Sequence, residues 1–449
     1  MKISRIELYY VKLPLEAKKP GFFSQPAYFT PSWIPGFRQS EMRFYLLRLG
    51  TDQGHEGYAA MPAMGSERKG LGPMLGSYLM GINPLDIRLV NQRIQEFSYI
   101  GMRNGWIDAA FWDIIGKAKG EPLWKLLGGS GGHVQPYFST GSTHGHDPAA
   151  IRTIARQARD AGYRGLKLRV KGDALAPMTD FVAAARDAAG ADMALMIDAN
   201  QGWPVDLFDE TPKWDLAFAT DFARSVEPYQ IKWLEEPLNR GNFEGLARLR
   251  QSTTVPIAGA EMNSTWRDFK AMLHLGSLDI YQPDAVLAGG TYAGGISVVY
   301  WLIREIQRRN KDDGAAKIKY CPHTWTTGLG FAVALQLVGL VPPEQRSLLE
   351  YPMEGPWQPQ HWARFIKGSF SPDPDGRIAI PDRPGLGVDI DWDVIRRFGK
   401  RIYRGTAGRL ALSTLIDRGF KQTLYLKSKK KEQVHRLEKA QFSIPQPPF

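Results

Sequence analysis

Three short apolar runs between residues 194 and 261 decide the fold, because each of them ends in an acid: ALMIDAN at 194–200, IKWLEEP at 231–237 and VPIAGAE at 255–261. Each run has the length and apolar character of a buried strand. Asp198, Glu235 and Glu261 stand at their ends. The repetition predicts three successive parallel strands that bring three carboxylates to one place.

The same pattern continues on both sides of this stretch. Five further strand candidates are VQPYFST (134–140), GLKLRV (165–170), LDIYQPDAV (278–286), IKYCPHT (318–324) and SLLEYP (347–352). Helical patterns lie between strands, for example at 147–162, 243–252, 265–276 and 293–310. Regular alternation of this kind predicts an α/β fold with a parallel (β/α) barrel, and a doubly wound open sheet is the alternative. The polar strand ends favour the barrel, whose active sites lie at the carboxyl ends of the strands.

Residues 1–130 are expected to form a separate α+β capping domain. Strand patterns at 3–15 and 42–51 are followed by helical patterns from about 65 to 127. Between the two strands, PGFFSQPAYFTPSWIPGF (20–37) is rich in Pro, Gly and aromatic residues. Such a segment is either a lid over the site or a packing element against the next domain. The expected division is therefore 1–130, a barrel with its return segment at 131–404, and a basic C-terminal tail at 405–449.

The charge of the chain is concentrated at its end. The net charge is +11, and residues 405–449 carry nine Lys or Arg against three acids. A tail of this composition is usually a solvated or partly helical appendage, and a nucleic-acid or partner-binding arm is the alternative. We expect the appendage, because a binding arm would leave the three strand-end carboxylates unexplained.

Several classes of protein are excluded or disfavoured. The one cysteine, Cys321, excludes an intrachain disulfide framework and a multi-cysteine zinc site. No run of about eighteen apolar residues occurs, and the N-terminus alternates like a strand, so we expect a cytoplasmic protein without a membrane partner. The glycine cluster GTYAGG (290–295) lacks the dinucleotide spacing, and no G-x-S-x-G elbow is present.

The carboxylate cluster predicts a hard divalent cation. Asp198, Glu235 and Glu261 offer only oxygen ligands, which suit Mg²⁺, with Mn²⁺ as the alternative. Side chains alternate along a strand, so one of Glu235 and Glu236 is expected to face the interior. We choose Glu235, because Glu236 precedes Pro237 at the start of the loop. Any one of these acids alone would more often be a strand-end cap.

The motifs DAN, LEEPL, GAE-x-N, QPD, PHT and LLEYP together resemble the enolase superfamily, in its mandelate racemase/muconate lactonizing enzyme branch. WIDAAFWDIIGKAKGEPLWKLLGG (106–129) resembles the helix that leads into the barrel in that branch. The resemblance covers residues 1 to about 400. It implies a (β/α)₇β barrel under an α+β cap, and a homo-oligomer that acts on a small carboxylate substrate.

The resemblance also implies roles for individual residues. Asp198, Glu235 and Glu261 match the metal ligands, and Asn200 and Asn263 stand beside them as candidate substrate contacts. Asp284 and His323 match a catalytic dyad, and Glu350 matches the acid of the last strand. In such a dyad the histidine takes the proton α to a carboxylate, and the aspartate orients the imidazole.

One position departs from the family pattern. The second barrel strand usually carries Lys-x-Lys, whereas this chain has Lys167-Leu168-Arg169. Arginine is a poor proton acceptor because its pKa lies above about 12. With His323 as the one convincing base, and Lys167 as a candidate contact for the substrate carboxylate, the sequence favours dehydration of a hydroxy acid or sugar acid. A racemase, epimerase or cycloisomerase remains the alternative, and Lys171 shares the face of Arg169 if the strand extends that far.

Overall fold

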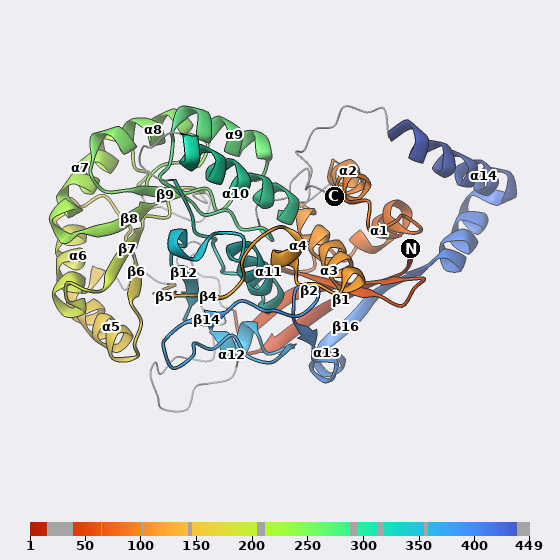
Figure 1. Cartoon of the computed structure of the whole chain (residues 1–449), viewed down its shortest axis with the longest axis horizontal. Coiled ribbons are helices and arrows are strands. Elements are labelled where there is room, and N and C mark those ends of the chain that lie inside the picture. The colour runs from red at the N-terminus through yellow and green to blue at the C-terminus, as the bar shows by residue number, and fades with distance from the viewer. Residues whose placement is uncertain are drawn as a thin grey trace.

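A computed structural model describes residues 1–15, 39–63, 65–99, 103–141, 146–203, 212–287, 295–312, 318–353 and 358–437. The chain forms a barrel lobe and a sheet lobe that lie side by side, and a helical arm extends from the sheet lobe (Figure 1). The aromatic segment predicted at 20–37 lies outside the described residues, as does His144.

The barrel lobe is built on eight parallel strands in the order β11-β10-β9-β8-β7-β6-β5-β12. All eight predicted strands are present: β5 (Pro136–Ser139), β6 (Gly165–Arg169), β7 (Ala194–Asp198), β8 (Ile231–Glu235), β9 (Ile257–Gly259), β10 (Ile280–Tyr281), β11 (Lys319–Tyr320) and β12 (Leu349–Pro352). The first and last of these strands, β5 and β12, pair with each other, which curls the sheet. At the seam between β11 and β12, the Cys321 thiol donates to the Leu348 carbonyl at 2.9 Å.

Helices surround these strands on the outside (Figure 1). They are α5 (Pro148–Asp160), α6 (Leu175–Ala189), α7 (Leu216–Val226), α8 (Phe243–Ser252), α9 (Trp266–Leu275), α10 (Gly295–Asp312) and α11 (Gly328–Val338). The strands are apolar on both faces because the outer face packs on these helices and the inner face fills the barrel. The inner cluster takes one side chain each from β5, β7, β8, β9, β10 and the end of β11: Tyr137, Met196, Trp233, Ala258, Ile280 and Cys321.

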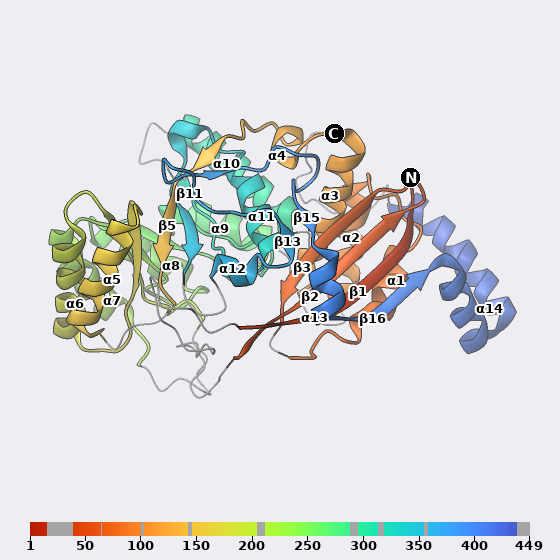
Figure 2. The same cartoon turned by 90° about the horizontal axis from the view of Figure 1, so that it is seen from below.

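The sheet lobe is an antiparallel sheet in the order β16-β1-β2-β3. Its strands are β1 (Ile3–Pro14), β2 (Glu41–Thr51), β3 (Glu56–Pro62) and β16 (Gly399–Thr406), and its helices are α1 (Leu71–Leu79), α2 (Ile87–Ser98), α3 (Asp108–Lys119) and α4 (Leu123–Leu126). Figure 2 shows these strands at the opposite end of the molecule from α5, α6 and α7. Since β16 pairs with β1, the return segment after the barrel completes the N-terminal sheet.

Short elements connect the barrel to β16. They are α12 (Pro359–Trp362), β13 (Ile366–Lys367), β14 (Ile378–Ala379), β15 (Asp389–Ile390) and α13 (Trp392–Phe398). Strand β13 pairs with β15, and β14 pairs with β4 (His133–Val134) just before the barrel begins. The return segment is thereby tied to the entrance of the barrel.

The two lobes meet at a buried carboxylate. Asp108 begins α3 and accepts hydrogen bonds from the backbone N–H groups of Ile296 and Ser297 at the start of α10. Its side chain is fully buried, and burial raises its pKa to about 7, although these hydrogen bonds oppose the rise. A carboxylate at a helix N-terminus also interacts favourably with the helix dipole, so Asp108 attaches the cap to the barrel.

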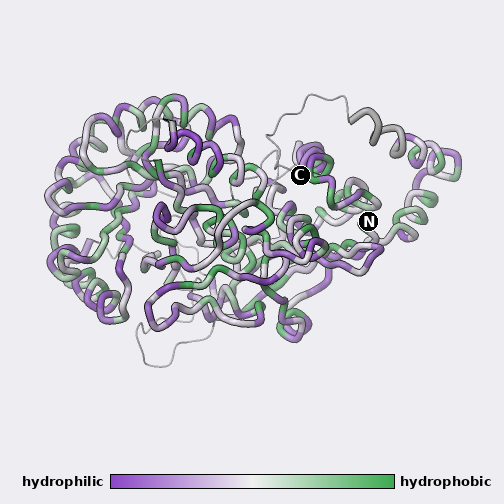
Figure 3. The backbone as a smooth tube through the Cα atoms, viewed as in Figure 1, coloured by the Kyte–Doolittle hydropathy of each residue, from purple (hydrophilic) through white to green (hydrophobic). Residues whose placement is uncertain are grey.

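The chain ends in the arm α14 (Ala407–Leu437), which is interrupted at Gly419. Seven large apolar side chains of α14 are 40% or more exposed: Leu412, Leu415, Ile416, Phe420, Leu424, Tyr425 and Leu426. Figure 3 shows hydrophobic and hydrophilic positions interleaved along it. The tail predicted at 405–449 is therefore helical over most of its length and projects from the sheet lobe. None of the helices in the described residues is both long and apolar enough to cross a bilayer.

Candidate active site

The predicted acids lie together at the carboxyl ends of the barrel strands. Arg169 at the end of β6 pairs in register with Asp198 at the end of β7, which in turn pairs with Glu235 at the end of β8. Glu261 follows β9 by two residues, and it is buried, with 4% of its surface exposed. Because neighbouring parallel strands end at one edge, the sequence order of these residues becomes spatial order at the barrel mouth.

Lys167 occupies the centre of this cluster. Its ammonium lies 2.8 Å from Glu235 Oε1, 2.6 Å from Glu350 Oε1 and 3.4 Å from Asp198 Oδ2, and the side chain has no exposed surface. Burial alone would lower its pKa, but the three carboxylates raise the pKa well above the usual value. Lys167 is therefore a permanently charged counter-ion beneath the mouth, and it is not a base.

Arg169 is held as firmly. Its Nη1 donates to Asp198 Oδ2 at 2.6 Å and to Asn200 Oδ1 at 2.7 Å, and its Nε donates to the Thr140 carbonyl at 2.6 Å. The guanidinium also lies over the Trp325 ring, 5.2 Å from its centroid. Burial would lower its pKa, but Asp198 and the other acids raise it above the usual value. Where the family carries a basic lysine, this chain carries a fixed cation.

His323 and Asp284 form the predicted pair. His323 Nδ1 lies 2.9 Å from Asp284 Oδ2, and Asp284 Oδ1 accepts from the backbone N–H groups of Val286 and Leu287. The other ring nitrogen, Nε2, lies 3.4 Å from Glu261 Oε2. Burial would lower the pKa of His323, whereas Glu261 and Asp284 raise it to about 9. The aspartate thus orients the ring so that Nε2 faces the carboxylate cluster.

Glu350, the acid of the last strand, accepts hydrogen bonds on both carboxylate oxygens. Its Oε1 accepts from Ser139 and Trp325 as well as from Lys167, and its Oε2 accepts from the backbone N–H of Thr324. Burial would raise its pKa, but Lys167 and His323 lower it to about 2. Glu350 is therefore an ionised acceptor that holds β12 against the neighbouring segments.

Both glutamates of the LEEP motif are buried. Glu235 accepts from Lys167, Trp233 and Gln282, while Glu236 is 3% exposed and has no hydrogen-bond partner on either carboxylate oxygen. Glu236 lies beyond the end of β8 with a φ of 47°, in the left-handed region. Neighbouring side chains point to opposite faces only within a strand, and Glu236 lies after the strand end. Strand alternation therefore does not prevent both Glu235 and Glu236 from being buried at the mouth.

The remaining candidates have smaller roles in the described geometry. Asn200 contacts Arg169, and the Asn263 amide lies 3.4 Å from the Arg240 carbonyl while its Oδ1 has no partner. Strand β6 ends at Arg169, so Lys171 lies in the following loop, where its backbone N–H donates to His146 Nε2. His55 lies between β2 and β3, outside the barrel.

Several contacts of the site were missing from the sequence prediction. Trp203 Nε1 donates to Glu261 Oε1 at 2.7 Å, and Gln282 donates to Glu235 at 2.7 Å. Trp325 Nε1 donates to Ser139 Oγ, and both residues donate to Glu350 Oε1. Gln282 and Trp325 each lie two residues from a predicted site residue, in QPD and HTW. Residues two apart share one face of a strand, so this spacing could have identified them.

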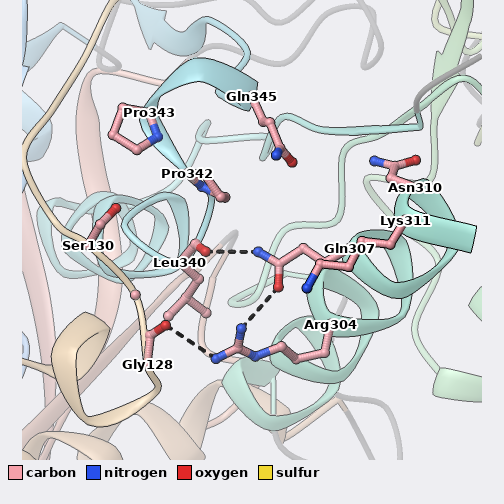
Figure 4. Close-up of a pocket in the computed structure, with 11 residues that line it drawn as sticks. Gly128, Ser130, Arg304, Gln307, Asn310, Lys311, Leu340, Pro342, Pro343 and Gln345 are labelled. Atoms are coloured by element: carbon pink, nitrogen blue, oxygen red, sulfur yellow. Dashed lines mark hydrogen bonds between the residues drawn. The ribbon is translucent and has the colours of Figure 1, made fainter.

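A cavity of about 350 Å³ lies elsewhere, at the opposite end of the barrel (Figure 4). It is lined by residues of α10, such as Arg304 and Gln307, by the segment after α11, such as Gln345, and by residues 128–130, which precede the barrel. In Figure 4, Arg304 and Gln307 point toward the backbone of Gly128 and Leu340 and hold these loops together. The cavity therefore lies between the loops that lead into the barrel strands, and none of the clustered carboxylates lines it.

The cluster has the negative charge that a cation needs, but its side chains are not arranged as a metal site. Within the described ranges, no group of three or more His, Cys, Asp or Glu side chains is arranged to hold a metal. However, six acids (Asp198, Glu235, Glu236, Glu261, Asp284 and Glu350) are buried at these strand ends, together with two permanent cations, Lys167 and Arg169. Excess buried negative charge of this size is costly unless a cation balances it, so the donor set fits a hard divalent ion.

Comparisons with known proteins agree with this arrangement. A family model described as "Enolase C-terminal domain-like" matches residues 150–394, and one for the mandelate racemase/muconate lactonizing enzyme N-terminal domain matches residues 26–128. The chain belongs to the enolase superfamily. Within it, the barrel and cap of this chain follow the mandelate racemase/muconate lactonizing enzyme branch, which confirms the resemblance and the fold expected from the motifs.

Similar members of the superfamily carry several activities. D-galactarolactone cycloisomerase of Agrobacterium fabrum is 29% identical over 65% of this chain and 72% of its own length. L-talarate/galactarate dehydratase of Salmonella typhimurium is 29% identical over 72% of this chain and 75% of its own length. A solved structure of a racemase from Streptomyces coelicolor with bound magnesium superimposes with a TM-score of 0.68, at 24% identity, over 89% of this chain and 100% of its own.

Proposed function

We propose that this enolase-superfamily enzyme dehydrates a hydroxy acid, in particular a sugar acid, with His323 as its base. The observation that carries the proposal is the asymmetry of the mouth. His323 is oriented by Asp284, whereas the position that would hold a second base is Arg169, tied to Asp198 and Asn200. Proton transfer across a planar intermediate needs acceptors on both faces, while elimination works with one.

The chemistry of this proposal balances with one histidine. His323 Nε2 takes the α-proton, and the electrons of that C–H bond form an enediolate. The bond from the β-carbon to its hydroxyl then breaks, and the His323 imidazolium returns the proton so that the hydroxyl leaves as water. The resulting enol tautomerises to a 2-keto-3-deoxy acid. The other cations have fixed roles: Lys167 and Arg169 hold the carboxylates of Glu235 and Asp198 in place.

A divalent cation belongs to this proposal. Asp198, Glu235 and Glu261 would hold Mg²⁺, or Mn²⁺ in its place, and the excess of buried acids supports this assignment. When bound, the cation would offset the carboxylates that raise the pKa of His323 and would stabilise the developing enediolate. Asn200 and Asn263 stand at the same mouth as candidate contacts for the substrate.

The test is a panel of acid sugars and other hydroxy acids with added MgCl₂, followed by detection of 2-keto-3-deoxy acids. The proposal predicts keto-acid formation that EDTA abolishes. If no keto acid forms but a substrate exchanges its α-proton in D₂O, the enzyme is a racemase or epimerase instead. An isomeric product without loss of water would identify a cycloisomerase.

A further inference from the structure

Glu236 is a buried acid that the arrangement described so far leaves without a role. The side chain is 3% exposed, and neither carboxylate oxygen has a hydrogen-bond partner. A buried carboxylate without a partner costs free energy, and proteins normally pair it or bind it to a cation.

The local backbone places this carboxylate at the mouth. Glu236 takes a left-handed φ of 47°, which is an uncommon and strained conformation for a residue other than glycine. The space for its carboxyl group exists because residue 202 is glycine: a Cβ on Gly202 would lie 2.2 Å from the Glu236 carboxyl carbon. The left-handed backbone of Glu236 and the absence of a side chain at Gly202 together allow the Glu236 carboxyl group to take this position.

The neighbouring acids already have partners. Asp198 is held by Arg169, Glu235 by Lys167 and Gln282, and Glu261 by Trp203 at 2.7 Å. Glu236 interacts electrostatically with all three of these acids and lacks a donor of its own. Among these four carboxylates, it is the one to which no side chain or backbone group of the described residues donates a hydrogen bond.

We propose that Glu236 supplies a fourth carboxylate to the divalent-cation site, beside Asp198, Glu235 and Glu261. This inference rests on the metal dependence in the proposed function and adds a residue to the ligand set inferred from the motifs. A hard cation can bind an additional carboxylate, and it would provide the Glu236 oxygens with the partner that they lack.

The experiment is isothermal titration calorimetry of the full chain with MgCl₂, together with the Mg²⁺-induced shift in melting temperature. Glu236→Gln keeps the shape of the side chain and removes its charge, so we expect Mg²⁺ binding at least tenfold weaker and a smaller thermal shift. Glu244→Gln is the matched control, because Glu244 is an exposed glutamate in α8, which follows the same loop. The control should bind Mg²⁺ as the wild type does.

Gly202→Ala provides a second variant that leaves the charge unchanged. Its new Cβ would displace the Glu236 carboxyl group, so Mg²⁺ binding should weaken severalfold. Unchanged Mg²⁺ binding by Glu236→Gln, with binding by the wild type, overturns the inference and leaves the proposed function standing. If the wild type itself binds no Mg²⁺, the metal-dependent function fails and this inference fails with it.

Discussion

Arg169 Nη1 lies 2.6 Å from Asp198 Oδ2, so the second barrel strand presents a paired cation at the position of a family base. The pair is almost completely shielded from solvent, since Arg169 is 4% exposed and Asp198 is fully buried. A guanidinium in this setting does not give up its proton. The chemistry of this chain therefore depends on the opposite side of the mouth, where His323 contacts Asp284.

Arg169→Lys should reduce activity without creating a second base. Lysine keeps the charge but cannot reach Asp198, Asn200 and the Thr140 carbonyl in one planar fork. We expect keto-acid formation to fall at least tenfold (about 1.4 kcal/mol) and no gain in α-proton exchange. Exchange is measured by NMR in D₂O. Racemisation by the variant at the rate of its dehydration would contradict the one-base account.

Lys167→Met should destabilise the barrel. The substitution leaves Glu235, Glu350 and Asp198 without their shared counter-ion, and removing one partner of a buried ion pair costs about 3 to 5 kcal/mol. The free energy of unfolding in urea measures this loss. Lys232→Met is the control, because Lys232 is an exposed lysine on barrel strand β8. Equal stability of the two variants would show that Lys167 is not the counter-ion described above.

The stability of the chain should fall as pH rises toward neutrality through the effect of Asp108. Its folded pKa of about 7 lies above the unfolded value of about 3.9, so the folded state retains a proton that the unfolded state loses. The contribution of Asp108 is therefore largest below pH 4 and is lost as pH rises to about 7. Asp108→Asn should flatten this part of the profile, whereas exposed Asp160→Asn should leave it unchanged. A profile that Asp108→Asn does not alter contradicts the burial argument.

Removal of residues 407–449 should leave the fold intact. Among the large apolar residues of α14, Leu410 packs against the core, whereas seven others are 40% or more exposed. We expect the melting temperature of the truncated chain to stay within about 2 °C of the wild type, which for a chain of this size corresponds to roughly 2 kcal/mol. Loss of cooperative unfolding would show that the arm is part of the structural core.

The sequence predicts the barrel well because its strands alternate regularly with helices and end in polar residues. It also brings Asp198, Glu235 and His323 to one end of the barrel, since strand order becomes spatial order. Two features escaped this reasoning for physical reasons. The inward turn of Glu236 depends on a left-handed backbone that residue identity does not announce, and the role of Lys167 depends on three partners between 31 and 183 residues away.

The return of β16 to the N-terminal sheet is a similar case. Its pairing with β1 joins residues about 400 positions apart, for example Arg5 with Thr406. Local periodicity marks a strand but not its distant partner, so the sequence indicates a return segment without its destination. The completion of the N-terminal sheet by β16 is therefore visible only in the assembled fold.

The most direct test of the account is His323→Asn, assayed for keto-acid formation and for Mg²⁺ binding in parallel. Asparagine retains a hydrogen-bonding group near Asp284 but cannot accept the α-proton. The account predicts that dehydration falls by a factor of about 10² to 10⁴ while Mg²⁺ binding and the melting temperature are retained. Dehydration within a few-fold of the wild type would contradict it, because another group would then be removing the proton.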